Sequence, residues 1–234
     1  MFDKKKTCPR CDHEFKAKDA KFCPACGTPV VQGHADIVVI VDRSGSMQSC
    51  HKATVDGFNR FLSDQKALPG TATMTVVQFD NEYKVLIDRK PLGEIAPVGM
   101  DAFTPRGGTA LFDAIGRSMA MMEAMAGVGT AVVCIITDGQ ENQSRECTQQ
   151  QVRDLIRRLE SKGWAFVYLG ANQDAFAVGH AMGMANAASY NATPGGTDAV
   201  YAAMSSNVRS FRVGGQSLMC ADFGNNVKGL AEAK

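Results

Sequence analysis

The sequence has no excess of charge of either sign and no long apolar run. Its 25 basic and 24 acidic residues leave a net charge of +1, so no overall field favours nucleic acid or an anionic membrane. The longest apolar stretches, IVVIV and AVVCII, have the length of β-strands and not of a membrane span. The opening residues, MFDKKKTCPRC, lack the apolar core of a signal peptide. We therefore expect a cytoplasmic protein that keeps its cysteines reduced and does not act at a membrane.

The signatures of several common catalytic sites are also missing. A nucleophile elbow needs G-x-S-x-G, but Ser44 follows Asp42 and Arg43, so this pattern fails. An aspartyl-phosphate enzyme would show a second acid close to Asp42, and position 44 holds a serine instead. The stretch GGTAL has no lysine and cannot be a P-loop, and no histidine stands where it would serve as a base. We therefore expect that the protein is not an enzyme.

Two cysteine pairs stand close together near the N-terminus. CPRC and CPAC are separated by eleven residues, and such pairs in a reduced compartment are typical of a tetrahedral structural zinc site. A rubredoxin-like iron site or a redox pair is the alternative. We predict a zinc ribbon over residues 1–30 and a linker over 31–34. The predicted Zn²⁺ ligands are Cys8, Cys11, Cys23 and Cys26.

Strand patterns alternate with helix patterns over residues 35–213. ADIVVIV and TAVVCIIT are apolar runs of the kind that is buried on both faces of a parallel sheet. TATMTVVQF and YKVLIDR are joined through the tight turn DNE, which predicts an antiparallel pair. Helical stripes separate the other strands. We predict an α/β fold with a doubly wound, mostly parallel, six-stranded sheet and one antiparallel edge strand, followed by a flexible tail over 214–234.

Three loops at predicted strand ends carry oxygen-bearing side chains. In an open α/β sheet, functional loops lie beyond the carboxyl ends of the strands, where the strand order reverses. Two carboxylates and three hydroxyls suit a hard cation such as Mg²⁺, and the absence of histidine and cysteine argues against zinc there. The candidate metal ligands are Asp42, Ser44, Ser46, Thr109 and Asp138.

These motifs resemble the metal-ion-dependent adhesion site of von Willebrand factor A (vWA) domains. The resemblance covers 35–213 and all five site positions, and GWAFVYLGANQDA is similar to bacterial and phage cytosolic members of the family. It implies a Rossmann-like doubly wound fold and a protein-binding face that depends on Mg²⁺ or Mn²⁺. The three hydroxyls would coordinate the ion, the two carboxylates would act directly or through water, and one position would stay free for a partner's carboxylate. Some relatives with this layout are associated with tellurium resistance, stress response or phages.

The resulting expectation is a non-enzymatic interaction protein whose partner presents an Asp or Glu to the metal. The candidate partner-binding rim consists of Arg43, Met47, Arg106 and Glu141. The alternative is a nucleic-acid-associated factor that uses the ribbon for DNA or RNA contact. Residues 1–33 have a charge balance of only about +3 and no aromatic platform, so nucleic acid is the less favoured partner.

Overall fold

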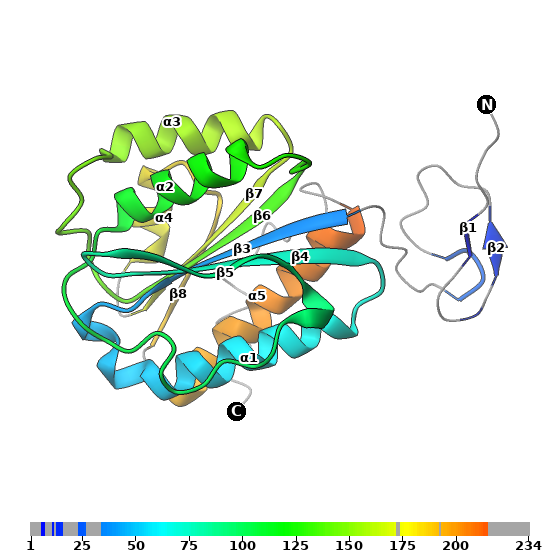
Figure 1. Ribbon diagram of the computed structural model, residues 1–234, viewed down its shortest axis with the longest axis horizontal. Helices are drawn as coiled ribbons and strands as arrows, with labels where there is room; N and C mark the ends of the chain where they lie inside the picture. The colour runs from blue at the N-terminus through cyan, green and yellow to red at the C-terminus, as the bar shows by residue number, and fades with distance from the viewer. Residues whose placement is uncertain are drawn as a thin grey trace.

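The main body of the protein is built on one twisted sheet. A computed structural model describes residues 6–7, 11, 13–15, 23–26, 34–171, 174–191 and 193–214 (Figure 1). The six strands lie in the order β5-β4-β3-β6-β7-β8. Their bounds are His34–Asp42 (β3), Thr71–Phe79 (β4), Tyr83–Pro91 (β5), Ala131–Thr137 (β6), Ala165–Ala171 (β7) and Asn186–Tyr190 (β8). Among the neighbouring strands of this six-stranded sheet, only β4 and β5 pair antiparallel, which confirms the predicted sheet with an antiparallel edge strand.

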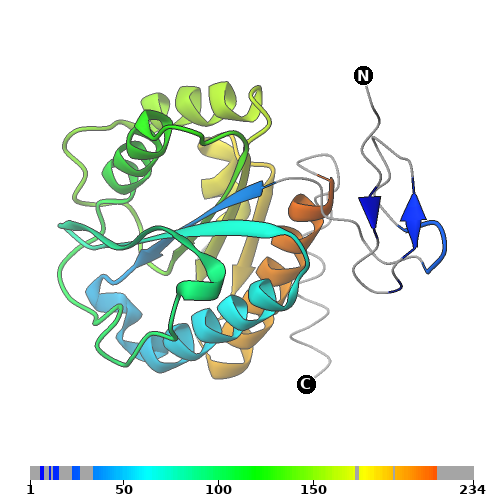
Figure 2. The same ribbon diagram turned by 45° about the vertical axis from the view of Figure 1, so that its right-hand side comes forward.

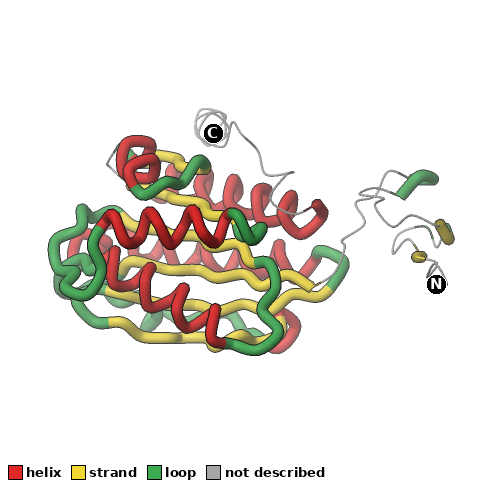
Figure 3. Tube along the Cα trace, turned by 90° about the horizontal axis from the view of Figure 1, so that it is seen from above, coloured by secondary structure: helices red, strands yellow, loops and turns green. Residues whose placement is uncertain are grey.

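Helices cover both faces of this sheet. In Figures 1 and 2, α1 and α5 lie on one face, while α2, α3 and α4 lie on the other. Seen from above in Figure 3, the helices run along the direction of the strands. None of the described helices is both long and apolar enough to cross a membrane. The bounds are Gly45–Cys50 (η1), His51–Ala67 (α1), Leu92–Glu94 (η2), Leu111–Ala124 (α2), Gln149–Glu160 (α3), Ala175–Ala181 (α4) and Pro194–Gly214 (α5).

Alternate side chains of the central strand β3 pack into two separate hydrophobic cores, one on each face of the sheet. Ile37 and Val39 pack in the core with residues of α1 and α5, whereas Val38 and Ile40 pack in the core with residues of α2 and α3. All of these positions are fully buried, as expected for a strand covered on both faces. The apolar run that predicted this strand is therefore explained by two layers of helices.

Local signals in the sequence set several element ends. Thr148 accepts a hydrogen bond from the Gln151 backbone and donates its own backbone N–H to the Gln151 side chain at 2.8 Å, which forms a capping box at the start of α3. Gly163, with φ of +87°, lies just past the end of α3.

The N-terminal part contains two short strands, Lys6–Thr7 (β1) and Glu14–Phe15 (β2), that pair antiparallel. His34, which the sequence placed in the linker, is already the first residue of β3, and α5 runs to Gly214 at the start of the predicted tail. Residues 27–33 and 215–234 lie outside the described residues, as does Cys8.

The strand order reverses between β3 and β6. After β3 the chain turns to β4 on one side, and it later returns to β6 on the other side of β3. Loops that leave the carboxyl ends of two such strands diverge, which opens a crevice between them. The predicted metal ligands are thus expected at this edge of the sheet.

Candidate metal centre

Two carboxylates stand side by side at the point where the strand order reverses. Asp42 is the last residue of β3, and Asp138 directly follows β6. The two strands are parallel neighbours, with Val41 opposite Ile136, so their ends lie at the same edge of the sheet. The sheet therefore brings together two residues that are 96 positions apart in the sequence.

The loop that follows β3, called here the first loop, carries Ser44 and Ser46, and these serines join the carboxylates through hydrogen bonds. The Ser44 backbone N–H donates to Asp42 Oδ1 at 2.6 Å, and the Ser44 and Ser46 hydroxyls lie 3.0 Å apart. Ser46 Oγ donates to Asp138 Oδ1 at 2.6 Å. Four of the five predicted ligands thus form one continuous polar cluster.

Gly139 shows that Thr109 belongs to the same cluster. A Cβ atom placed on Gly139 would lie 2.6 Å from Thr109 Oγ1, 3.4 Å from Ser44 Oγ and 3.5 Å from Asp42 Oδ2. Three candidate ligand oxygens from two other loops therefore surround the α-carbon of this glycine. Any larger residue would displace Thr109 or close the space among these oxygens.

The charges of this cluster are not balanced within the protein. Asp42 is fully buried, and this burial raises its pKa to about 6, although hydrogen bonds from Thr137 and Ser44 act in the opposite direction. Burial also raises the pKa of Asp138, and the hydrogen bond from Ser46 lowers it. Within the part of the chain that the structure describes, no basic side chain lies at ion-pair distance from either carboxylate. Two neighbouring acids without a cation fit a site that receives one from solution.

Contacts between the loops hold the cluster in shape. The second loop precedes α2 and carries Thr109, and the third loop follows β6 and carries Asp138. The Gly45 N–H donates to the Gly107 carbonyl at 3.1 Å, which links the first loop to the second. The Asn142 N–H donates to the Thr109 carbonyl, and the Asn142 side chain accepts from the Thr109 N–H, both at 3.0 Å. The three loops are thus connected through their backbones, and the ligand oxygens are oriented without an ion.

Thr137 is a member of the site that the sequence did not single out. Its hydroxyl donates to Asp42 Oδ2 at 2.5 Å and accepts from the Gly139 N–H at 3.2 Å. It is the last residue of β6 and is fully buried. A hydroxyl at the end of a strand that neighbours Asp42 was the signal that could have identified it.

Two of the four residues predicted as a partner-binding rim, Arg43 and Met47, are buried. Met47 is 1% exposed and Arg43 is 8% exposed, so neither fits the prediction of an open rim. Both belong to the short turn of backbone that carries the serines, and this turn packs inward. Arg106 is half exposed, but its guanidinium contacts Asp80 and Glu82. The fourth, Glu141, accepts hydrogen bonds from the backbone of Phe112, Gln143 and Ser144, which fixes the third loop.

The cysteines near the N-terminus form a second candidate metal centre. The sulfur atoms of Cys11, Cys23 and Cys26 all lie within 4.8 Å of one another, and Cys11 Sγ and Cys23 Sγ are 3.7 Å apart. The fourth predicted ligand, Cys8, lies outside the described residues. Three thiols that converge in this way fit a soft or borderline cation such as Zn²⁺. Outside this cluster, Cys50 and Cys134 are buried and Cys147 is partly buried, which is typical of cysteines that pack as small hydrophobic side chains.

Comparison with known proteins agrees with the α/β fold of the main body. Residues 37–140 match the family model of the von Willebrand factor type A domain. Similar solved structures include a von Willebrand factor type A protein from Catenulispora acidiphila, with 16% identity and a TM-score of 0.57 over 78% of this chain and 44% of that chain. The vWF domain of the pilus tip protein Mfa5 from Porphyromonas gingivalis is 13% identical, with a TM-score of 0.57 over 76% of this chain and 96% of that one.

A third similar structure is the pilus adhesin SpaC from Lactobacillus rhamnosus GG, with 14% identity, a TM-score of 0.60 and coverage of 76% of this chain and 31% of that chain. The present chain therefore spans less than half of two of these three proteins. No curated protein matches the chain. At these identities the likeness shows the fold, which is the vWA-like α/β fold.

Proposed function

We propose that this protein is a non-enzymatic interaction module that binds an acidic residue of a protein partner through Mg²⁺ at the carboxyl edge of its sheet. The observation that carries the proposal is the cluster of two carboxylates and three hydroxyls from three loops, in which no basic side chain of the described residues pairs with either carboxylate. The match of residues 37–140 to the vWA family model supports it, because that domain type is generally an adhesion or interaction module.

The chemistry of the ligands explains how such a site would work. Ser44, Ser46 and Thr109 would hold the ion through neutral hydroxyls, while Asp42 and Asp138 would orient these hydroxyls or bound water. When bound, Mg²⁺ supplies a positive charge that the neutral ligands leave largely uncompensated, so a partner's carboxylate is attracted to it. The hydrogen bonds from Thr137 and the Ser44 backbone keep the Asp42 carboxylate in one orientation.

The proposal is tested by capturing partners from the native cell with and without the metal. We expect partners to be retained in Mg²⁺ and released by EDTA. They should also be lost with Thr109→Ala but not with Thr104→Ala, because Thr104 is exposed and donates to the Asp101 carbonyl, away from the cluster. Equal capture in EDTA would contradict the proposal. Metal-dependent hydrolysis that disappears with Asp42→Ala would identify an enzyme instead.

We also propose that the N-terminal cysteines hold one structural Zn²⁺. The three converging sulfur atoms support this, and a segment of this size buries too little apolar surface to be stable without a metal. Cys23→Ser should therefore abolish stoichiometric zinc, whereas Cys147→Ser, outside the cluster, should retain it. Unchanged zinc content in Cys23→Ser would contradict this assignment. The cytoplasmic location and the association with stress response or phages stay predictions from the sequence.

A further inference from the structure

We propose that Asp80, a buried carboxylate outside the ligand set, is the positioning residue that holds two of the three metal-site loops together. This inference rests on the proposed metal site. The sequence showed Asp80 only as part of the DNE turn between β4 and β5. The structure places it next to the ligand loops and gives it contacts with both.

Asp80 occupies the same edge of the sheet as the candidate ligands. It follows the last residue of β4, and that residue, Phe79, pairs with Asp42 in the parallel neighbour β3. Asp80 is fully buried, and its Oδ1 accepts a hydrogen bond from the Glu82 backbone at 2.5 Å. Its second oxygen, Oδ2, points toward the loops that carry the hydroxyl ligands, as its contacts show.

Two arginines, one from each loop, meet at this second oxygen. Arg106 Nε donates to Asp80 Oδ2 at 2.7 Å. Arg43 Nε lies 3.1 Å from the same oxygen, but its N–H is not aligned for a hydrogen bond, so the contact is ionic. Arg43 stands between the candidate ligands Asp42 and Ser44, and Arg106 stands three residues before Thr109. One carboxylate therefore contacts both loops within three residues of a candidate ligand.

Backbone hydrogen bonds complete the connection. The Arg43 N–H donates to the Phe79 carbonyl and the Arg106 N–H to the Arg43 carbonyl, both at 2.8 Å. The Ala110 N–H, next to Thr109, donates to the Asp80 carbonyl at 2.9 Å. The end of β4, the first loop and the second loop thus form a closed ring of contacts around the Asp80 side chain.

The charge of Asp80 would also act on a bound cation through the two arginines. Arg43 and Arg106 would repel Mg²⁺, and their charges are matched by Asp80 and by Glu82, which contacts Arg106 and lies 3.9 Å from Arg43. Without the Asp80 charge, Arg43 would be a buried guanidinium with only a distant anion, located beside two ligands. Loss of Asp80 should therefore loosen the loops and add uncompensated positive charge near the ion.

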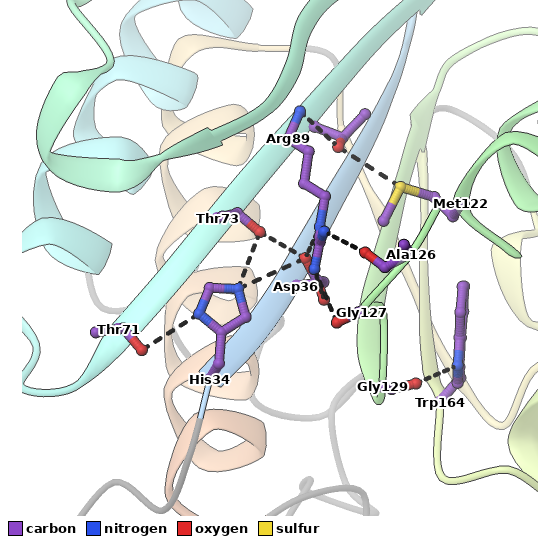
Figure 4. A network of polar contacts seen from close by, with 11 residues as sticks. His34, Asp36, Thr71, Thr73, Arg89, Met122, Ala126, Gly127, Gly129 and Trp164 are labelled. Atoms are coloured by element: carbon purple, nitrogen blue, oxygen red, sulfur yellow. Dashed lines mark hydrogen bonds and ion pairs between the residues drawn. The ribbon is translucent and has the colours of Figure 1, made fainter. Parts of the chain in front are cut away.

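A similar cluster at the opposite edge of the sheet provides a matched control. There the buried carboxylate of Asp36 accepts from Arg89 Nε at 2.8 Å and from Thr73 Oγ1 at 2.5 Å (Figure 4). It is as buried as Asp80 and also pairs with arginine, but it lies at the start of β3 and not at its end. Asp36→Asn should thus reproduce the structural cost of losing a buried carboxylate without touching the metal-site loops.

The experiment measures Mg²⁺ affinity by titration calorimetry in the full chain for the parent, Asp80→Asn, Arg106→Gln and Asp36→Asn. We expect Asp80→Asn to weaken Mg²⁺ binding by about ten- to a hundredfold and Arg106→Gln by up to about tenfold, since outer-shell partners of metal ligands have effects of this size. Asp36→Asn should bind like the parent. If Asp80→Asn does not fold, Arg106→Gln decides, because Arg106 is half exposed and its loss leaves the fold intact.

Hydrogen exchange of the metal-free proteins gives a second readout. The amides of 43–47 and 106–110 should exchange faster in Asp80→Asn and Arg106→Gln than in Asp36→Asn. Parent-like affinity and exchange in both variants would overturn the inference while leaving the metal site intact. A parent that binds no Mg²⁺ would overturn the proposed function, and the exchange data would still decide whether Asp80 positions the loops.

Discussion

Buried carboxylates lie in opposite electrostatic environments at the two ends of the strands, which are called here the amino edge and the carboxyl edge of the sheet. At the amino edge, Asp36 is neutralised within the protein: Arg89 pairs with it and also donates to the carbonyls of Ala126 and Gly127, both at 2.9 Å (Figure 4). At the carboxyl edge, Asp42 is equally buried, but no basic side chain of the described residues pairs with it, and it accepts hydrogen bonds from Thr137 and Ser44 instead.

This difference separates the residues that stabilise the fold from those that prepare a site. A buried charge that is paired and hydrogen-bonded is stable within the protein, whereas an unpaired one raises the free energy of the folded state. The raised pKa of Asp42 reflects this cost. The charge of Asp36 is therefore balanced within the protein, whereas under the proposed function a cation would balance the charge of Asp42.

The largest expected effect on stability is at the amino edge. Arg89→Met removes the partner of Asp36 but keeps much of the side-chain volume, so we expect the free energy of unfolding to fall by about 3 kcal/mol. Mg²⁺ affinity should not change, because the ligands lie at the far ends of the strands. Urea unfolding measures the change in stability, and Lys90→Met, at the exposed position next to Arg89, is the control. A comparable loss of Mg²⁺ affinity would erase the distinction between the two edges.

The second expected effect is an increase in the stability of the metal-free protein when Asp42 loses its charge. In Asp42→Asn the buried charge is gone, so the metal-free protein should become more stable, by about 1–3 kcal/mol near pH 7.5. The same variant should no longer be stabilised by Mg²⁺. Thermal unfolding with and without Mg²⁺ measures both changes, and Asp101→Asn, at an exposed position, serves as the control. If Asp42→Asn is less stable than the parent without metal, Asp42 is part of the structural frame and not of an unbalanced site.

Much of this contrast follows from the sequence, because it depends on where strands end. Asp42 and Asp138 directly follow apolar runs, and parallel strands place their carboxyl ends together, so their meeting was predictable. The directions of loop side chains were not. Arg43 and Arg106 were predicted to face a partner because they flank the ligands, but the guanidinium groups of both contact the buried carboxylate of Asp80. That contact depends on the pairing of β4 beside β3, which no local pattern specifies.

The pH dependence of the carboxyl edge should invert when metal is added. Because the pKa of Asp42 is raised to about 6 in the folded protein, the folded state holds this proton more tightly than the unfolded state. The stabilisation of the folded state by this proton is thus fully present below the ordinary pKa of an aspartate, and it is lost as the pH rises through about 6. Mg²⁺ affinity should instead increase over the same range, because the ion competes with the proton. Denaturation and titration series from pH 5 to about pH 8 measure the two trends. Identical slopes in Asp42→Asn would assign the effect to other groups.

The smallest expected effect concerns the space beside Thr109. Gly139→Ala would place a methyl group 2.6 Å from Thr109 Oγ1, so we expect Mg²⁺ affinity to fall about fivefold, equivalent to ~1 kcal/mol of strain. Gly129→Ala is the matched control at the amino edge, since a Cβ there has no atom within 4 Å. Equal affinities in the two variants would show that the ion does not need the oxygens around Gly139 in this arrangement.

The most direct test of the central claim is a calorimetric titration of Mg²⁺ into the metal-free protein, repeated with Asp42→Asn and Thr109→Ala. The two residues come from different loops and meet only beside Gly139. We predict a single Mg²⁺ site per chain in the parent and the loss of that site in each variant, with both variants still folded. A parent that binds no Mg²⁺, or variants that bind it as the parent does, would contradict the claim that the carboxyl edge of this sheet is a metal site.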